Sequence, residues 1–105
     1  MNDYVPAQMK PAEFHPGADV EFEEAKEFYN SQVSGLGDEF YYLVVAGIRE
    51  IRLAPDRFSK YQHNTRRLRL KHFPYLIVFR ESETIILIVA IAHGSRRGGY
   101  WADRI

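Results

Sequence analysis

Apolar residues recur at helical spacing in two neighbouring stretches of the chain. The second stretch follows the i, i+3, i+4 rule without a break, and Pro55 ends it at about Ala54. Residues 34–37 (Ser-Gly-Leu-Gly) predict a reversal between the two, so the pattern indicates an antiparallel helical hairpin. The predicted core-facing residues are Ala18, Phe22, Ala25, Phe28, Tyr29 and Val33, followed by Phe40, Leu43, Val44, Gly47, Ile48 and Ile51.

After Pro55 the period of the pattern changes from that of a helix to that of a strand. Arg67, Arg69 and Lys71 alternate with Leu68, Leu70 and His72, which predicts a strand with three cations on one face. Residues 75–79 predict a second strand, and the polar residues 81–83 a hairpin loop. Residues 85–92 are apolar on both sides, so this third strand is expected to be central.

The N-terminal part of the chain adds one short element. Residues 1–8 are expected to form a loose leader, and residues 9–14 a short edge strand, because Pro11 is tolerated only at an edge or a strand start. Asp19 is the expected cap of the first helix, followed by Glu21, Glu23 and Glu24 in its first turn.

The order strand, helix, helix, strand, strand, strand predicts an α+β fold. A helical hairpin is expected to pack on one face of a small, mainly antiparallel sheet within a single domain spanning residues 1–105. The other face is expected to be partly open and to carry the cations.

Composition narrows the class of protein. The chain has 105 residues, of which 46% are hydrophobic and 27% charged, so a globular domain is expected rather than a disordered chain. It has no cysteine, which excludes disulfides and thiolate chemistry and is compatible with the cytoplasm. Neither a membrane-spanning run nor a secretory signal is evident in the sequence.

A net charge of zero hides a strong asymmetry between the two halves of the chain. Residues 1–56 carry eleven acidic and four basic side chains, whereas residues 57–105 carry three acidic and ten basic ones. One interpretation is a basic working surface for a polyanion or an acidic protein segment. The other is that the two halves neutralise each other across an internal interface.

Four stretches of the sequence resemble the RelE/ParE superfamily of toxins from bacterial toxin–antitoxin modules. They are residues 14–18 with the acidic helix, residues 36–51 with Pro55, residues 67–69 with 73–79, and residues 91–93 with Arg96, Gly99, Tyr100, Trp101 and Arg104. The resemblance covers about residues 12–104. It implies an α+β toxin held inactive by a cognate antitoxin, which typically wraps it with a helical and extended, acidic C-terminal segment. An oligomer formed through the antitoxin is possible.

The two branches of this superfamily predict different chemistry. One cleaves messenger RNA on the ribosome, which requires a base, an acid and cations around the phosphate. Here His93, Arg96 and Tyr100 are the candidate catalytic residues for that branch alone. The ParE-like branch poisons DNA gyrase and has no accepted catalytic residues. In either branch the candidate anion-binding and antitoxin-binding residues are Arg67, Arg69, Lys71, Arg96 and Arg97.

Each candidate also has a structural interpretation. His93 can serve as a hydrogen-bonding residue, the cations of residues 67–71 as a solvated face, and Tyr100 with Trp101 as packing for the tail. Tyr61, His63 and His72 are not spaced like metal ligands, so neither a metal site nor a cofactor is expected.

The strand exit His93-Gly94-Ser95-Arg96 resembles the ParE-like pattern. The nuclease branch usually carries several cations in the loop where Lys60 stands nearly alone. A gyrase inhibitor is therefore favoured over a ribosome-dependent RNase. A third hypothesis, a non-toxic partner protein that binds an acidic segment, stays open.

Overall fold

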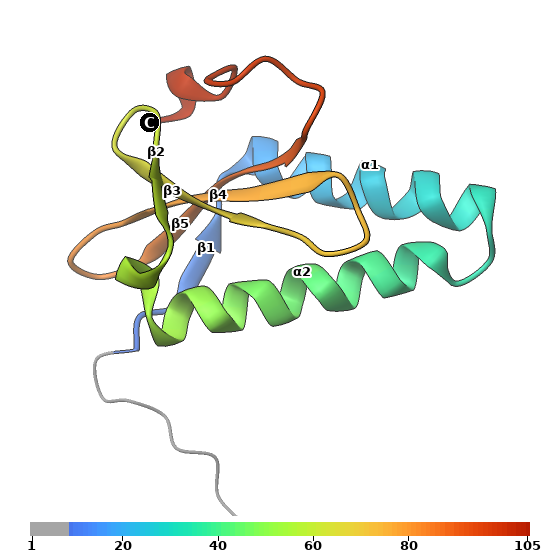
Figure 1. Ribbon diagram of the computed structural model, residues 1–105, viewed down its shortest axis with the longest axis horizontal. Helices are drawn as coiled ribbons and strands as arrows, with labels where there is room; N and C mark the ends of the chain where they lie inside the picture. Colours follow the sequence, from blue (N-terminus) through green and yellow to red (C-terminus); the bar gives the residue numbers. More distant parts are fainter. Residues whose placement is uncertain (1–8) are drawn as a thin grey trace, which may run out of the picture.

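The computed structural model describes residues 9–105, so the leader predicted for residues 1–8 lies outside the described part. A five-stranded sheet has the strand order β1-β5-β4-β3-β2 and carries the helices α1 and α2 on one face (Figure 1). β1 pairs with β5 in parallel, and all other pairs are antiparallel. The α+β prediction is confirmed. The elements are β1 Ala12–Phe14, α1 Pro16–Gln32, α2 Leu36–Leu53, β2 Ser59–Tyr61, β3 Thr65–Arg69, β4 Tyr75–Glu81 and β5 Ile86–His93, with short 3₁₀ turns at Pro55–Arg57 and Ala102–Arg104.

The helical hairpin forms as its pattern predicts, but the first cap differs. His15, not Asp19, caps α1, because Nδ1 of His15 accepts the N–H of Gly17 at 3.0 Å. Pro16 starts the helix with its φ preset and without an N–H that would need a partner. Gly35, at φ 88°, turns the chain between the helices. α2 ends at Leu53 with Ala54 as its cap, as Pro55 predicts.

The face that the helices present to the sheet is mostly the predicted one. Ala18, Phe22, Phe40, Val44 and Ile51 are buried against the sheet residues of the main core. The prediction is wrong for Phe28 and Val33, which are 56% and 59% exposed. Phe28 lies on the flank of the stripe formed by Ala18, Phe22, Ala25 and Tyr29, and Val33 is the cap residue that follows the last turn of α1.

The first predicted antiparallel strand is shorter and has a partner that the pattern missed. β3 begins at Thr65 and ends at Arg69, so Lys71 and His72 lie in the following bend, where His72 adopts φ 68°. β2 pairs with β3 at the edge of the sheet. Its sequence Ser-Lys-Tyr is short and exposed, with no hydrophobic alternation that could reveal it.

β5 is central, as its apolar sequence predicts, and it carries a bulge. Val78 pairs with Ala90 whereas Phe79 pairs with Ile88, so Val89 is the extra residue. Val89 and Ala90 therefore both lie in the second core, on the face away from the helices, while Ile88 and Ile91 face the helices. The bulge resets the alternation so that His93 also lies on the helical side.

The second face, which was expected to be partly open, is covered in part by the C-terminal tail. Trp101, only 1% exposed, packs there with Leu76, Val78 and the bulged part of β5. Figure 1 shows the red C-terminal tail lying across the sheet from α2. The tail covers this face because the bulged central strand presents an apolar surface on both sides. Within residues 9–105, no helix is both long and apolar enough to span a membrane.

Candidate functional site

Four of the candidate anion-binding residues lie on two separate surfaces. Arg67, Arg69 and Lys71 line a groove between β3 and α2, which is called the β3 groove below. Arg96 lines a smaller pocket beside α1 at the end of β5. Arg96 therefore does not share a surface with the candidate cations of residues 67–71, because β4 separates β3 from β5 and the tail carries Arg96 toward α1.

The β3 groove has a volume of about 530 Å³ and combines an apolar floor with a basic rim. α2 approaches the sheet closely at Gly47, where a Cβ would lie 3.0 Å from Cδ1 of Ile77. Leu43, Leu68 and Leu70 supply apolar surface, while Glu50 is the sole acidic residue that the described part of the chain contributes to the lining. The remaining lining residues are Ala46, Gly47, Arg57, Phe58, Ser59, Arg67, Arg69 and Lys71.

The cations at the rim of the β3 groove form few stabilising contacts with the rest of the described chain. The guanidinium of Arg67 lies 4.4 Å from the ring centre of Tyr61, a cation–π contact that leaves its charge in place. Arg57 lies 3.8 Å from Glu50, and both side chains are largely exposed, so this pair contributes little. No carboxylate of residues 9–105 forms an ion pair with Arg69 or Lys71.

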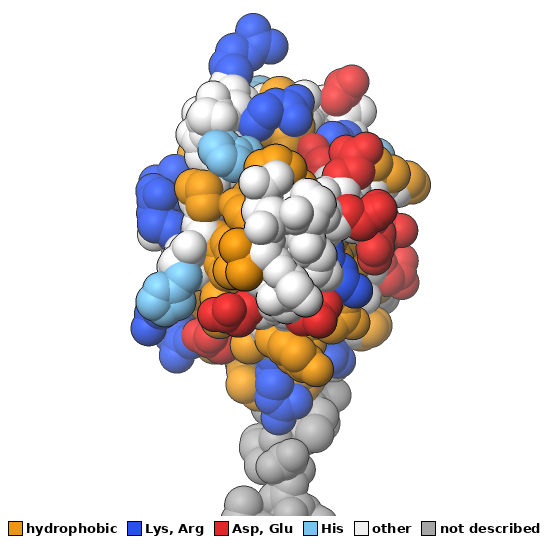
Figure 2. Space-filling model, turned by 90° about the vertical axis from the view of Figure 1, so that its right-hand side faces the viewer, with side chains coloured by type: hydrophobic (Ala, Val, Ile, Leu, Met, Phe, Trp, Pro, Cys, Tyr) orange, Lys and Arg blue, Asp and Glu red, His pale blue; other side chains and the backbone are white. Residues whose placement is uncertain are grey.

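Internal neutralisation accounts for few of the cations. Of the ten basic side chains in residues 57–105, Arg57 and Arg104 alone pair with carboxylates of the preceding half among the described residues. Figure 2 shows most of the acidic side chains of that view on its right and mainly Lys and Arg on its left. On this face of the molecule the two kinds of charge are therefore largely separated.

His93, Arg96 and Tyr100 do meet, in the second pocket. Its volume is about 190 Å³, and the guanidinium of Arg96 lies 3.8 Å from the ring centre of Tyr100. Nδ1 of His93 accepts the N–H of Ser95 at 3.0 Å and lies 2.7 Å from the Ser95 hydroxyl. This is the same local contact that His15 makes with Gly17. Two glutamates share the pocket, whose full lining is Glu21, Glu24, Ala25, Phe28, Tyr75, Ile91, His93, Arg96 and Tyr100.

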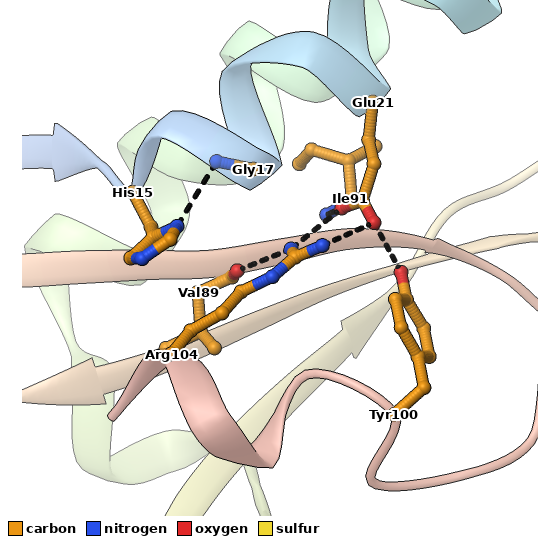
Figure 3. Close-up of polar contacts among 7 residues, drawn as sticks. All are labelled: His15, Gly17, Glu21, Val89, Ile91, Tyr100 and Arg104. Atoms are coloured by element: carbon orange, nitrogen blue, oxygen red, sulfur yellow. Dashed lines mark hydrogen bonds and ion pairs between the residues drawn. The ribbon is translucent and has the colours of Figure 1, made fainter.

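Glu21 is the centre of a polar network that the sequence did not reveal. One carboxylate oxygen accepts the backbone N–H of Ile91 at 3.0 Å and Nη1 of Arg104 at 3.1 Å. The other accepts the Tyr100 hydroxyl at 2.6 Å and Nη2 of Arg104 at 2.9 Å, as Figure 3 shows. Arg104 also donates to the carbonyl of Val89 at 3.0 Å. Glu21, Tyr100 and Arg104 are called the tail latch below.

The tail latch satisfies the backbone of β5 where β1 ends. The last strand residue of β1, Phe14, lies opposite Ile88, and the N–H of His15 donates to the Ile88 carbonyl. Beyond that point no strand of residues 9–105 lies beside β5 on this side, yet β5 is buried. Glu21 and Arg104 bind the Ile91 N–H and the Val89 carbonyl in place of a strand.

The opposite side of the tail is held by the turn between β2 and β3. A Cβ on Gly98 would lie 2.9 Å from Nε2 of Gln62, and one on Gly99 would lie 2.9 Å from the side-chain oxygen of the same residue. The ring of His63 packs edge-on against Trp101, with the ring centres 5.7 Å apart. The tail is therefore fixed between α1 and the β2–β3 turn.

The pKa shifts within the tail latch bear on whether Tyr100 could donate a proton in RNA cleavage. Burial, and then the hydrogen bond to Glu21, raise the pKa of the Tyr100 hydroxyl. The hydrogen bond to Glu21 likewise raises the pKa of Arg104. A hydroxyl that holds its proton more tightly and already donates to a carboxylate is a poor proton donor to a substrate. The adjacent glutamates also oppose the approach of a phosphate.

None of the described residues offers a metal site, because no three His, Cys, Asp or Glu side chains in residues 9–105 are grouped as ligands. His63 contacts Trp101, and His72 is an exposed bend residue.

Comparison with solved structures identifies the class of fold. A chain from the chromosomal ParDE toxin–antitoxin system of P. aeruginosa superposes with a TM-score of 0.72. The match covers 83% of this chain and 98% of that chain, at 14% sequence identity. The arrangement of two helices packed on a five-stranded, mostly antiparallel sheet is thus a fold that this chain shares with a chain of that system.

The sequence model of one family identifies the chain further. The family described as the ParE toxin of the type II toxin–antitoxin system parDE matches residues 12–98. The chain belongs to this ParE toxin family. A search of curated protein sequences found no match. The matched segment includes the β3 groove and Glu21, whereas Tyr100 and Arg104 of the tail latch follow it.

We expect Glu21→Gln to lower the free energy of unfolding by about 2–3 kcal/mol. The amide would leave Arg104 without its counter-ion in a site where the two side chains are only 18% and 15% exposed. Urea denaturation measures the change. The control is Glu24→Gln, which alters an exposed neighbour on the same pocket and should stay within about 0.5 kcal/mol of wild type. Equal effects of the two variants would contradict this role for Glu21.

The raised pKa of Tyr100 predicts a specific pH dependence. A tyrosine in the unfolded chain ionises near pH 10, whereas folded Tyr100 retains its proton, so its contribution to stability is complete below pH 10 and is lost as the pH rises further. The stability advantage of wild type over Tyr100→Phe should therefore be constant up to about pH 9 and shrink above pH 10. Tyr29 and Tyr75, whose pKa values are also raised by burial, are present in both proteins and cancel. Urea denaturation between pH 7 and 11 tests this, and a constant difference would contradict it.

Proposed function

We propose that this ParE-family chain is a growth-inhibiting toxin that acts by binding DNA gyrase and is held inactive by an antitoxin with an acidic segment. The family match supports the toxin assignment and the antitoxin partner. The observation that carries the mode of action is the engagement of Tyr100 by Glu21. We infer that the protein works as a binding module in the cytoplasm, without RNA cleavage.

The alternative, ribosome-dependent RNA cleavage, is favoured by one observation and opposed by two. His93, Arg96 and Tyr100 line one pocket, as a nuclease would need. However, Tyr100 is bound to Glu21, and Nδ1 of His93 is occupied by the N–H of Ser95. The Tyr100 hydroxyl and Nδ1 of His93 therefore stabilise the C-terminal tail, and neither is free to act on a substrate.

The β3 groove is the proposed antitoxin site. Four cations surround an apolar floor there, and Glu50 alone opposes them. An acidic segment with interspersed apolar residues complements such a surface in both charge and hydrophobicity. Arg96 and Arg97, which the sequence also suggested for this role, lie in the tail; Arg96 stacks on Tyr100 beside α1. Arg96 and Arg97 are therefore proposed to contribute less to antitoxin binding than the cations of the β3 groove.

A gyrase supercoiling assay with antitoxin-free protein tests the target. We expect inhibition at micromolar protein, together with arrest of growth when the chain is expressed alone. Primer extension on translated messages in the same cells should show no cuts at the ribosomal A site. Such cuts, if slowed about 10²-fold by His93→Ala or Arg96→Ala, would establish the nuclease instead. Normal growth with soluble protein would favour a non-toxic binding partner.

Reversal of one rim charge should weaken antitoxin binding. We expect Arg69→Glu to raise the dissociation constant by about 10-fold or more, because it replaces an attraction with a repulsion in the β3 groove. The effect should be largest at low salt, where surface charges are least screened. Arg49→Glu makes the same charge change on an exposed position of α2 outside the groove and serves as the control. Titration calorimetry at two salt concentrations measures both, and an affinity insensitive to Arg69→Glu and to salt would refute the site.

A further inference from the structure

A pocket at the β2–β3 hairpin contains three cations that belong neither to the β3 groove nor to the tail latch. Lys60 comes from β2, Arg66 from β3 and Arg80 from β4. The pocket has a volume of about 270 Å³, and none of its described lining residues also lines the β3 groove. It is called the hairpin pocket below.

Two of these cations lie directly opposite each other on neighbouring strands. Lys60 and Arg66 are Cα partners in the antiparallel pairing of β2 with β3. Side chains at such positions lie on the same face of the sheet, so two like charges repel each other and destabilise the pairing. No carboxylate of residues 9–105 forms an ion pair with either residue. An anion bound between Lys60 and Arg66 would replace this repulsion with two attractions.

Backbone carbonyls hold the two guanidinium groups of the hairpin pocket in place without neutralising them. Nη1 of Arg66 donates to the carbonyl of Phe58 at 2.6 Å. Nη2 of Arg80 donates to the carbonyl of His63 at 2.6 Å, and its Nε donates to that of Asn64 at 3.3 Å. A carbonyl carries no net charge, so both arginines keep their full positive charge. No acceptor of residues 9–105 occupies Nη2 of Arg66 or Nη1 of Arg80, which leaves these donors available to a ligand.

The turn between β2 and β3 presents its carbonyls to Arg80 through an unusual backbone conformation. His63 and Asn64 both have a φ of 58°, in the left-handed region that residues other than glycine seldom adopt. Such residues persist where the surrounding structure holds them. The hydrogen bonds from Arg80 and the contact of His63 with Trp101 provide that support. The guanidinium of Arg80 is therefore positioned before any ligand binds.

The acidic residue of the described lining already has a partner outside the pocket. A carboxylate oxygen of Glu81 lies 2.7 Å from Nζ of Lys10, in an ion pair. The three cations therefore give the hairpin pocket a net positive charge. Tyr61 and Phe79 are the apolar residues of the described lining, and Phe79 is fully buried. The hairpin pocket thus lacks the apolar floor of the β3 groove and suits a hydrophilic anion.

We propose that the hairpin pocket binds a phosphate group, which belongs either to a free phosphate ester or to a nucleic-acid backbone. The planar guanidinium offers paired N–H donors that match two phosphate oxygens, and a lysine adds a point charge. The pocket is smaller than the roughly 300–1,000 Å³ typical of sites for drug-sized ligands, so it fits one phosphate group rather than a whole cofactor. This site is independent of the proposed antitoxin site and of the proposed action on gyrase.

Nuclear magnetic resonance titration of the antitoxin-free wild-type chain tests this site. The probes are inorganic phosphate and a short DNA duplex, each added at an ionic strength held constant with chloride. We expect saturable shifts of the Nε–H signals of Arg66 and Arg80 with at least one probe. Saturation by phosphate but not by the duplex would identify a free phosphate ester. Saturation by the duplex, with an affinity that falls as salt rises, would identify a nucleic-acid backbone. The absence of a saturable shift with both probes would overturn the proposal.

A matched pair of lysine variants separates the hairpin pocket from general surface charge. Lys60→Gln removes one phosphate contact and breaks no ion pair of residues 9–105, so the affinity for the probe that binds should fall about 5-fold or more. Lys71→Gln removes the same charge from the β3 groove and should change this affinity by less than about 2-fold. Circular dichroism checks that both variants are folded. Equal losses of affinity in the two variants would show a response to overall charge and would contradict the proposed site.

Discussion

A buried central strand that extends beyond its neighbour is the constraint on which this structure depends. β5 is apolar on both faces and is paired along its whole length with β4, but β1 reaches only as far as Ile88. The backbone groups that follow would be buried without partners, which costs more than one ordinary hydrogen bond contributes. The Glu21–Arg104 pair meets that need, and in doing so it joins α1 to the C-terminal tail. One ion pair therefore completes the sheet, anchors the tail and keeps the second apolar face covered by Trp101.

This arrangement explains why the residues that suggested catalysis are poor candidates for it. Tyr100 is held by Glu21 and stacks on Arg96, and His93 closes a local turn with Ser95. Each group acts on the tail that covers the sheet. In the β3 groove, by contrast, Arg69 and Lys71 form no ion pair with a carboxylate of residues 9–105. The charges of Arg69 and Lys71 are therefore available for ion pairs with a binding partner.

The sequence was informative wherever local periodicity governs the fold. The helical hairpin, the central strand and the end of α2 before Pro55 follow from spacing and from proline alone. β2 was not predicted because three short, exposed residues show no hydrophobic alternation. The bulge at Val89 was not predicted because a uniformly apolar strand has no alternation that a bulge could interrupt. The tail latch joins Glu21 to residues 79 and 83 positions further along the chain, and Glu21 looks like one more acid in the first turns of a helix. The His15 cap shows the same limit, because Asp19 has the more usual side chain for that position.

The two margins of the sheet connect the fold to its partner. At the β5 edge, Glu21 and Arg104 occupy the backbone groups of Ile91 and Val89, whereas no side chain of residues 9–105 does so at the edge of β3 beside Arg69. There the short β2 leaves the backbone of Arg69 facing a groove that already has a hydrophobic floor and a positive rim. The acidic N-terminal half and the basic C-terminal half of the chain then have separate consequences. Glu21 is used internally in a largely buried ion pair, whereas most of the basic charge remains on the surface, where it can attract and orient a negatively charged segment before the closer contacts form.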